Sequence, residues 1–255
     1  MASDGPLLST SRDAFLDGRL VLDQPCTGYR IAIDPFFLAA AVPAQAGDQV
    51  LDVGCGVGAA ALALACRVPG CHLTGIELQP TLADLAAGNA ARHAIPLTLW
   101  RGDLADPAPD WPRNSFDHVL TNPPYLEPAD GTPPPDGGRA LAHVNSRLSL
   151  AGWLAQCLRF LRPGGSVTVV HRADRLDAIL AAMIGKAGAI EVFPLWPKPG
   201  QPARRVLVRA RKGRKTPLTL HPGLMVHRAD GGFSPAAEAI LRQGRSVTEA
   251  LQGEG

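Results

Sequence analysis

A regular alternation of short apolar runs with helical patterns, beginning at residue 49, constrains the fold of this chain more than any other feature of its sequence. Strands are expected at 49–53, 73–77, 97–101, 116–120 and 166–171, and helices at 59–67, 81–93, 149–161 and 175–186. Strands that alternate with helices form right-handed crossovers, which build a mostly parallel sheet with helices on both faces. Residues 189–193 and 205–209 are two further strands with no helix between them, so the sheet should end in an antiparallel hairpin. The sequence therefore predicts a doubly wound α/β fold.

The 255 residues are enough for one domain with short appendages. The expected division is an N-terminal segment at 1–47, an α/β domain at 48–211 and a C-terminal extension at 212–255. In the N-terminal segment, a strand is expected at 19–22 and a helix at 35–41, which Pro35 would begin. In the extension, Ser234 should cap a helix that runs to Arg242, and the last ten residues should be frayed.

Composition excludes several classes of protein. Apolar residues make up 46% and charged residues 19% of the chain, which is typical of a globular protein and not of a disordered one. The longest nearly uninterrupted apolar stretch, 57–66, is about half the length that a membrane span requires. The N-terminus lacks the basic start and apolar centre of a secretory signal, so we expect a cytoplasmic protein.

Five cysteines are scattered along the chain, without the spacing of a disulfide framework or of a paired Cys-x-x-Cys motif. We interpret them as reduced thiols. The tightest group is Cys66, Cys71 and His72, but a zinc site needs about four convergent ligands. No metal is therefore expected.

Basic residues are concentrated in one segment. Residues 192–215 contain eight lysines and arginines and no acidic residue; removing these eight from the 25 basic residues of the chain leaves 17 against 23 acidic ones. Such a segment favours a polyanionic partner such as a nucleic acid, and the simpler interpretation is a strand with a polar face. The candidate phosphate ligands are Lys198, Arg204, Arg205, Arg211 and Lys212.

A glycine-rich turn follows the first strand of the alternation. In Asp52-Val53-Gly54-Cys55-Gly56-Val57-Gly58, the glycines permit a tight turn and a close approach of the backbone to a ligand. The pattern G-x-G-x-G differs from the dinucleotide fingerprint G-x-G-x-x-G. Less of the helix N-terminus then faces a pyrophosphate, so the turn suits a cofactor that carries none.

Acidic residues follow the next two strands. Glu77 ends the second strand, where its carboxylate can accept hydrogen bonds from both ribose hydroxyls of a nucleoside. Asp103 follows the third strand, where it can accept a hydrogen bond from an adenine amine. Either residue alone is more often a helix cap or a solvated charge, but their order after the glycine turn predicts a nucleoside pocket at the carboxyl edge of the sheet.

These residues resemble the S-adenosylmethionine-dependent methyltransferases of the Rossmann-like class I, over roughly residues 49–210. The resemblance implies a Rossmann-like fold and S-adenosyl-L-methionine as the cofactor, with S-adenosyl-L-homocysteine as the product. It implies that Asp52, Gly54, Gly56 and Gly58 line the methionine end, that Glu77 holds the ribose and that Asp103 holds the adenine, with Leu78 and Leu104 beside them.

The fourth strand ends in Thr121-Asn122-Pro123-Pro124-Tyr125, the most specific motif of the chain. Proline lacks an N–H donor, so the carbonyls of Asn122 and Pro123 should project from the sheet toward the cofactor. The Asn122 side-chain oxygen and the Pro123 carbonyl can then accept both hydrogens of a planar amino group, which exposes its lone pair to the methyl group. Tyr125 offers a flat face for a base. The motif resembles that of methyltransferases acting on base amines and on the glutamine amide of release factors.

The N-terminal residues resemble the bacterial valine-tRNA adenine-N6-methyltransferase family. The matching segments are 19–25, with Gln24, and 29–40, with Asp34-Pro35-Phe36-Phe37-Leu38. The resemblance implies that the partner is tRNA, that the substrate is the adenosine beside the anticodon, and that Gln24 and residues 34–38 close the cofactor pocket. The chain departs from the family pattern at Ala32, where glycine is commoner, and at Phe37, where leucine is commoner.

Two other functions stay open. Protein glutamine-N5 methyltransferases share Asn-Pro-Pro-Tyr, but they carry a larger helical N-terminal domain than the 47 residues before the α/β domain allow. The second alternative is a non-catalytic RNA-binding factor with a methyltransferase shell. The loop 127–142 is expected to grip substrate, and Arg139, His143 and Arg147 are either phosphate ligands or solvated charges. We expect a tRNA-binding protein without a membrane partner, and a monomer is favoured.

Overall fold

The computed structural model of the chain describes residues 9–28, 30–124 and 147–252. Its strands are β1 (Thr10–Phe15), β2 (Leu20–Pro25), β3 (Gln49–Val53), β4 (His72–Glu77), β5 (Leu97–Arg101), β6 (Phe116–Thr121), β7 (Leu161–Arg172), β8 (Ala187–Trp196), β9 (Arg205–Lys212), β10 (Thr219–Leu220) and β11 (Leu224–Met225). Its helices are α1 (Asp34–Ala41), α2 (Ala59–Arg67), α3 (Pro80–Arg92), α5 (Leu150–Phe160), η1 (Ala173–Arg175), α6 (Leu176–Met183), α7 (Pro235–Leu241) and α8 (Val247–Gln252).

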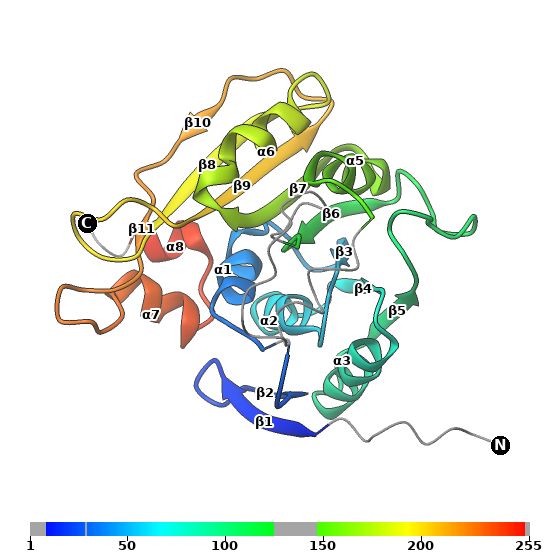
Figure 1. The fold of residues 1–255 in the computed structure, drawn as a ribbon, viewed down its shortest axis with the longest axis horizontal. Coiled ribbons are helices and arrows are strands. Elements are labelled where there is room, and N and C mark those ends of the chain that lie inside the picture. Colours follow the sequence, from blue (N-terminus) through cyan, green and yellow to red (C-terminus); the bar gives the residue numbers. More distant parts are fainter. Residues whose placement is uncertain (1–8, 29, 125–146, 253–255) are drawn as a thin grey trace.

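One large sheet organises these elements (Figure 1). Its strand order is β10-β8-β9-β7-β6-β3-β4-β5, and β11 also pairs with β8. The strands from β5 to β7 are parallel, whereas β9 lies antiparallel between β7 and β8. The predicted fold, a mostly parallel sheet that ends in an antiparallel hairpin, is therefore confirmed. Because β3 lies between β4 and β6, the winding direction changes there, and folds of this type bind ligands at the carboxyl edge beside that point.

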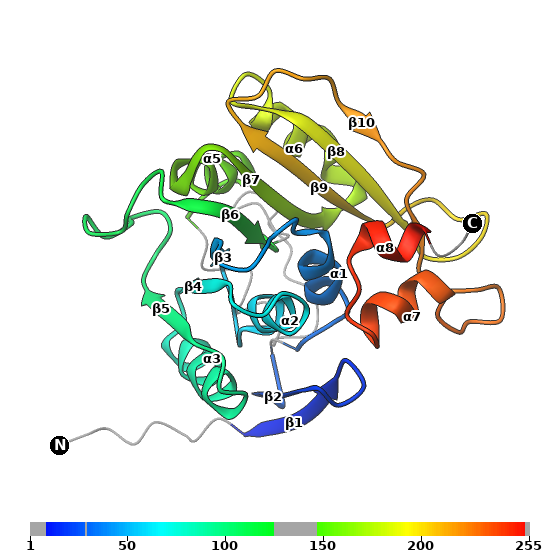
Figure 2. The same cartoon turned by 180° about the vertical axis from the view of Figure 1, so that it is seen from behind.

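Apolar side chains on both faces of the sheet form two cores, which the two opposite views show to be covered by different helices (Figures 1 and 2). One core joins α1, α2, α7 and α8 and includes Val50 and Leu62. The other joins α5 and α6 and includes Leu51, Val53 and Leu154. Successive residues of β3 therefore enter opposite cores, as the two-residue period of a strand requires.

The predicted elements of the α/β domain lie within a few residues of the observed ones. The Ser149 hydroxyl accepts a hydrogen bond from the Gly152 N–H at 3.2 Å and begins α5 at the expected place. The helix predicted at 175–186 is shorter, ending at Met183, because Gly185 has a φ of 79° that lies outside the helical region. The strand predicted at 189–193 is longer, since β8 runs to Trp196.

An N-terminal hairpin of β1 and β2 lies against α2 and α3, where only the second strand was expected. The Asn89 side chain, which is fully buried, joins this hairpin to the glycine-rich turn after β3: it accepts a hydrogen bond from Asp23 N at 2.7 Å and donates to Val57 O at 3.1 Å. Gln24 is 1% exposed, and its side chain accepts a hydrogen bond from Ile31 N at 2.7 Å. These buried amides hold the start of the chain against the α/β domain.

The expectation that the last ten residues are frayed is wrong. Residues 247–252 form α8, whose Val247 and Ala250 are 2% and 3% exposed and belong to the same core as α1. The helix predicted from Ser234 is confirmed as α7, with the Ser234 hydroxyl accepting from Ala237 N at 3.1 Å. α7 and α8 lie beside α1 in both views (Figures 1 and 2). The chain after β9 thus completes one of the two cores.

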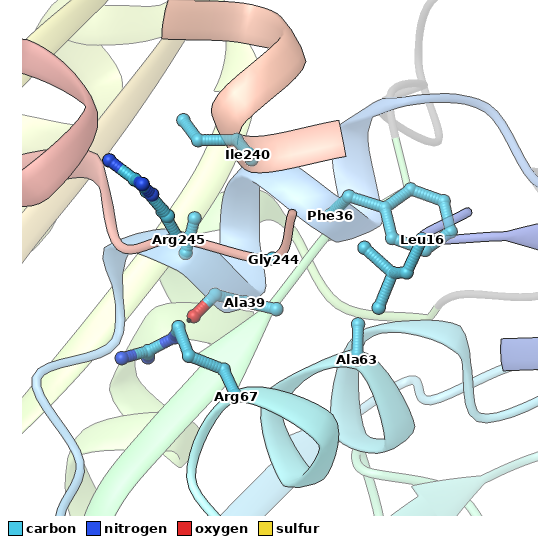
Figure 3. A pocket seen from close by; sticks show the side chains of 9 residues that line it. Leu16, Phe36, Ala39, Ala63, Arg67, Ile240, Gly244 and Arg245 are labelled. Atoms are coloured by element: carbon cyan, nitrogen blue, oxygen red, sulfur yellow. Dashed lines mark hydrogen bonds between the residues drawn. The ribbon is translucent and has the colours of Figure 1, made fainter. Parts of the chain in front are cut away.

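A small pocket lies where the hairpin, α1, α2 and the turn after α7 meet (Figure 3). Leu16, Phe36 and Ile240 line it together with Arg67, whose guanidinium donates to the carbonyls of Ala39 at 2.9 Å and Val42 at 2.5 Å. These carbonyls end α1, so Arg67 caps that helix from α2. Among the described helices none is long and apolar enough to span a lipid bilayer.

Candidate active site

The turn after β3 folds back beneath the end of β4. The N–H of Gly54 donates a hydrogen bond to the carbonyl of Ile76 at 2.9 Å. Gly54 and Gly58 have φ angles of 74° and 86°, which other residues rarely adopt. A side chain on Gly54 would also lie 3.1 Å from the ring of Trp153. Glycine at these positions therefore keeps the backbone of the turn open to a ligand at the start of α2.

Glu77 lies at the carboxyl end of β4 and is fixed by the glycine turn. One carboxylate oxygen accepts a hydrogen bond from Gly56 N and the other from Gln79 N, both at 2.8 Å. The side chain is 6% exposed, and burial raises the pKa of its carboxyl group, while these backbone N–H groups oppose the rise. An ionised carboxylate has about four acceptor sites. Two bonds to the backbone therefore orient Glu77 and leave acceptor capacity for a bound hydroxyl group.

Asp52 lies beneath the glycine turn, where it is 3% exposed. Its Oδ2 accepts a hydrogen bond from Ala61 N at 3.1 Å, in the first turn of α2. Burial raises the pKa of Asp52 to about 7; the bond from Ala61 opposes the rise, and the nearby charge of Glu77 adds to it. The structure thus shows Asp52 supporting the turn from inside the protein.

The predicted adenine side of the pocket contains one buried and one exposed leucine. Leu104 is 4% exposed and belongs to the core under α5, whereas Leu78 is 39% exposed beside Glu77. Asp103 accepts a hydrogen bond from Ala105 N at 2.8 Å and pairs with the Arg147 guanidinium at 2.9 Å. Arg147, a candidate phosphate ligand, is therefore engaged with the candidate adenine ligand.

Asn122 follows β6 at the same carboxyl edge. Its Oδ1 is buried, and within the described part of the chain no donor reaches it. A buried amide oxygen without a donor costs free energy of about 1–3 kcal/mol, and a bound amino group would remove that cost. Pro123 is buried and Pro124 half-buried at the end of the strand. Tyr125 and Arg139 lie outside the described residues.

Two side-chain roles that the sequence does not indicate, those of Thr121 and Trp153, hold this motif in place. Thr121, fully buried at the end of β6, donates its hydroxyl to Val53 O at 2.8 Å and accepts the indole N–H of Trp153 at 2.9 Å. These bonds connect β3, β6 and α5 behind the motif. No local pattern identifies them, because the partners are 68 and 32 residues apart in the sequence.

The structure joins two residues that were assigned to different ligands. Asp34, at the start of α1, forms an ion pair at 3.0 Å with Arg205, at the start of β9. Asp34 is 9% exposed, and no charge partner for it could be deduced from spacing across 171 residues. The predicted cofactor residue and the predicted phosphate ligand therefore connect the N-terminal segment to the sheet.

The candidate phosphate ligands lie at opposite ends of the sheet. Arg205 pairs in register with Arg172, at the carboxyl end of β7, and the exposed Lys198 and Arg204 lie in the connection just before it. Arg211 pairs with Ser166, toward the amino end of β7, and Lys212 donates to Leu161 O at 2.8 Å. Seven residues of strand separate Arg205 from Lys212, roughly 24 Å. Only the first group shares an edge with Asn122.

Comparison with known proteins assigns this arrangement to a family. The family model described as the methyltransferase small domain matches residues 32–191, which is more than half of the chain. A tRNA1(Val) (adenine(37)-N6)-methyltransferase from Aeromonas hydrophila is 30% identical over 84% of this chain and 89% of its own. A solved structure of a predicted O-methyltransferase from Agrobacterium tumefaciens, 26% identical, has a TM-score of 0.68 over 84% of this chain and 97% of its own.

The chain is therefore an enzyme of the class I methyltransferases, with the methyltransferase small domain. Within this class it belongs to the tRNA1(Val) (adenine-N6)-methyltransferase family. A release factor glutamine methyltransferase from Geobacter sulfurreducens is 42% identical, but over only 32% of this chain and 28% of its own. That match is confined to a part of the domain.

The residues present fit S-adenosyl-L-methionine, the methyl donor that the family implies. Gly54 has no side chain, so the backbone of the glycine turn is accessible to a ligand; a Cβ at this position would contact the ring of Trp153. Glu77 lies at the end of the next strand with acceptor capacity, and Leu78 exposes an apolar surface beside it. The free acceptor on Asn122 lies at the end of β6, which neighbours β3. Within the described residues, no three His, Cys, Asp or Glu side chains gather as a metal site requires.

Proposed function

We propose that this enzyme transfers a methyl group from S-adenosyl-L-methionine to the N6 amine of an adenosine in tRNA, leaving S-adenosyl-L-homocysteine. The observation that carries the proposal is the buried Oδ1 of Asn122, for which the described residues provide no donor. The relative from Aeromonas hydrophila is named for adenine 37 of a valine tRNA, which supports that adenosine as the substrate.

The proposed chemistry requires two hydrogen-bond acceptors for the amine and the exclusion of solvent from the reacting atoms. The Asn122 side-chain oxygen and the Pro123 carbonyl accept the two amine hydrogens, which orients the nitrogen lone pair and draws it out of conjugation with the ring. The bound cofactor supplies an electrophilic methyl group on a sulfonium. The amine loses a proton after the transfer, so these residues orient and desolvate rather than act as a base. Tyr125 would stack on the adenine once it has left its neighbours.

For the cofactor, the glycines of the turn would line the methionine end above Asp52. Glu77 would accept the ribose hydroxyls, and Asp103 the adenine amine, with Leu78 against the ring. Asp34 would close the pocket from α1, held in place by Arg205. Gln24 supports this arrangement indirectly, because it fixes Ile31 just before α1.

For the RNA, the position of Lys198 and Arg204 at the carboxyl edge supports phosphate contacts beside the target adenosine. Arg211 and Lys212 would reach only RNA that extends along β9 to the other edge. Arg139 is a further candidate from the sequence alone.

The experiment is methyl transfer from labelled S-adenosylmethionine to unmodified total bacterial tRNA, followed by mass spectrometry of the nucleosides. We expect N6-methyladenosine from the wild type and at least ~100-fold less from Asn122→Ala, with cofactor affinity retained. Asn114→Gly is the matched control, since the Asn114 side chain lies at the other edge, where it accepts a hydrogen bond from Lys212.

The same assay includes a release factor as acceptor, because its glutamine methyltransferases match a part of this chain. Labelled release factor with unlabelled tRNA would replace the tRNA assignment by protein glutamine methylation. Cofactor binding without transfer to either acceptor would contradict both assignments and favour a non-catalytic RNA-binding role.

A further inference from the structure

Trp153 is a half-buried side chain that contacts both halves of the candidate site and has no part in the chemistry proposed above. Its ring lies against the glycine turn: a Cβ on Gly54 would be 3.1 Å from Cζ2 and 3.3 Å from Cη2 of the indole. Its Nε1 donates a hydrogen bond at 2.9 Å to the hydroxyl of Thr121, the residue before Asn122. Because Cζ2 and Nε1 are bonded to the same ring carbon, one edge of one rigid ring faces both segments.

The hydrogen-bond ladder of the sheet ends just before the groups proposed to bind the two reactants. In the parallel pairing of β3 with β6, the last paired residues are Val53 and Thr121. Gly54 and Asn122 follow them directly. The pairing of β6 with β7 also ends at Thr121, and the two prolines after Asn122 have no N–H to donate to a neighbouring strand. The separation between the glycine turn and Asn122 therefore depends on contacts outside the ladder.

The Thr121 hydroxyl connects the indole to the backbone of β3. It donates to Val53 O at 2.8 Å, and it accepts from the indole N–H, which can only donate. Thr121 and Val53 are both fully buried, so the loss of either bond would leave a buried polar group without its partner. The chain of bonds therefore runs in one direction, from the indole through the hydroxyl to the carbonyl that precedes Gly54.

The first turn of α5 fixes the backbone that carries the indole. Trp153 N donates to Ser149 O at 2.8 Å, and the Ser149 hydroxyl caps the same turn. The Trp153 side chain also packs against the core that contains Val53 and Leu154. A rigid ring with two rotatable bonds on an anchored backbone has little freedom to move. The indole is thus suited to hold the two segments at a constant separation.

We infer that Trp153 is a positioning residue for methyl transfer, whose indole and its bond to Thr121 fix the glycine turn, which would hold the methyl donor, relative to Asn122, which would hold the amine. This inference rests on the proposed function. Trp153 contacts neither reactant in this role; it acts through Gly54 and Thr121. A displacement of about 1 Å can slow a reaction about 100-fold, so the rate of the chemical step should depend on Trp153 more than either binding affinity does.

The test compares three variants. Trp153→Phe removes the indole N–H and keeps a ring, Thr121→Val removes the hydroxyl and keeps the shape, and Thr121→Ser keeps the hydroxyl. Single-turnover methylation is measured with enzyme and S-adenosylmethionine in excess over unmodified tRNA. We expect the rate to fall about 10- to 100-fold in Trp153→Phe and Thr121→Val, and to stay within about threefold of wild type in Thr121→Ser. Dissociation constants for S-adenosyl-L-homocysteine and tRNA, measured by calorimetry, should change by less than about threefold.

The double variant tests whether the two side chains act together. Without the Thr121 hydroxyl, the indole N–H has already lost its acceptor. Adding Trp153→Phe to Thr121→Val should therefore slow the reaction by less than about twofold beyond Thr121→Val alone. A rate loss equal to the product of the two single losses would mean that the side chains act independently, which would overturn the inference.

Trp196 supplies the matched control. Its side chain is half-buried, and its indole N–H also donates to an oxygen, the carbonyl of Pro222, at 3.0 Å. It lies on β8, which β9 and β7 separate from β6. Trp196→Phe loses the same type of hydrogen bond as Trp153→Phe, and it should leave the single-turnover rate within about twofold of wild type. An equal slowing in both variants would indicate a general loss of structure and would contradict the inference.

Wild-type single-turnover rates in Trp153→Phe and Thr121→Val would also overturn the inference, as would a rate loss that disappears at saturating cofactor. If Thr121→Val does not fold, Trp153→Phe and Thr121→Ser decide: a slow first variant and a near-normal second one support the inference. A wild type that methylates only release-factor glutamine would overturn the tRNA assignment alone, and the same variants on that substrate would then decide the role of Trp153. A wild type that methylates neither acceptor would overturn both.

Discussion

A buried carboxyl group can keep its proton up to nearly neutral pH, and Asp52 is such a group in this protein. Burial raises its pKa to about 7, whereas an unfolded chain would return it to 3.8. The protonated form can still accept the hydrogen bond from Ala61 through its carbonyl oxygen. The glycine turn of the candidate cofactor site thus lies over a group whose charge changes near neutrality.

This shift has a definite sign for stability. The folded state binds the proton more tightly than the unfolded state, so the stability present at acid pH is lost as pH rises through about 7. Relative to Asp52→Asn, the free energy of unfolding of the wild type should fall by about 2–3 kcal/mol between pH 5 and pH 8.5. Urea denaturation of both proteins at these two pH values measures it. Parallel pH profiles for the two proteins would show that Asp52 is not the group responsible.

At the scale of single elements, α3 contains a glycine without a structural requirement. Gly88 lies in the interior of this helix, is exposed, and a Cβ on it would meet no atom within 4 Å. Because glycine loses more backbone entropy in a helix than alanine, Gly88→Ala should raise the free energy of unfolding by about 1 kcal/mol. Thermal or urea denaturation measures the change.

Gly75 in β4 is the contrasting control. A Cβ on Gly75 would lie 2.7 Å from Sγ of Cys55, so Gly75→Ala should destabilise the protein. A decrease in stability for both substitutions would mean that α3 does not tolerate alanine at position 88.

The elements of the α/β domain are predictable because each carries its own periodicity and its own turn. Ser149 and Ser234 begin helices as N-caps where the sequence indicates, through contacts within three residues. β1 and α8 were missed because their burial is imposed from elsewhere in the chain. β1 alternates only between exposed and half-buried residues, and α8 is six residues long and stabilised by contacts with α1.

At the scale of the whole molecule, charge distribution depends on topology. Eight basic residues lie close together in the sequence, which suggests a single basic surface. In the structure, β9 runs from the carboxyl edge of the sheet to the amino edge, so these residues are distributed between the two edges. Arg209, between the two ends, is neutralised by an ion pair with Glu191 at 2.6 Å. The basic segment is therefore divided into two groups, and only one of them lies near Asn122.

Salt dependence of tRNA binding tests this division. Lys198→Ala with Arg204→Ala should weaken binding and reduce the slope of log affinity against log salt by about 2, because two phosphate contacts and their released counterions are lost. Arg214→Ala with Lys215→Ala, exposed at the other edge, is the control and should change the slope less. An equal change in both double variants would indicate that tRNA lies along the whole of β9.

Some residues of the candidate site could be predicted from the sequence, and others could not. The glycine turn, Glu77 and Asn122 are visible in the sequence because each lies at a strand end with a local signature. Trp153 is not, because it lies within a helix whose pattern indicates packing alone. Its relation to the motif exists only once α5 packs against β6 and the indole N–H reaches Thr121.

The first and last parts of the described chain depend on each other. Leu16 and Leu20 of the N-terminal hairpin share a core with Ile240 and Val247, and the Arg19 guanidinium donates to Arg242 O at 2.9 Å. A ribosome makes the hairpin more than 200 residues before these partners. The part of its apolar surface that these late partners cover therefore stays exposed for most of synthesis, at about 5–20 residues per second for some ten seconds or more, which is a binding opportunity for chaperones.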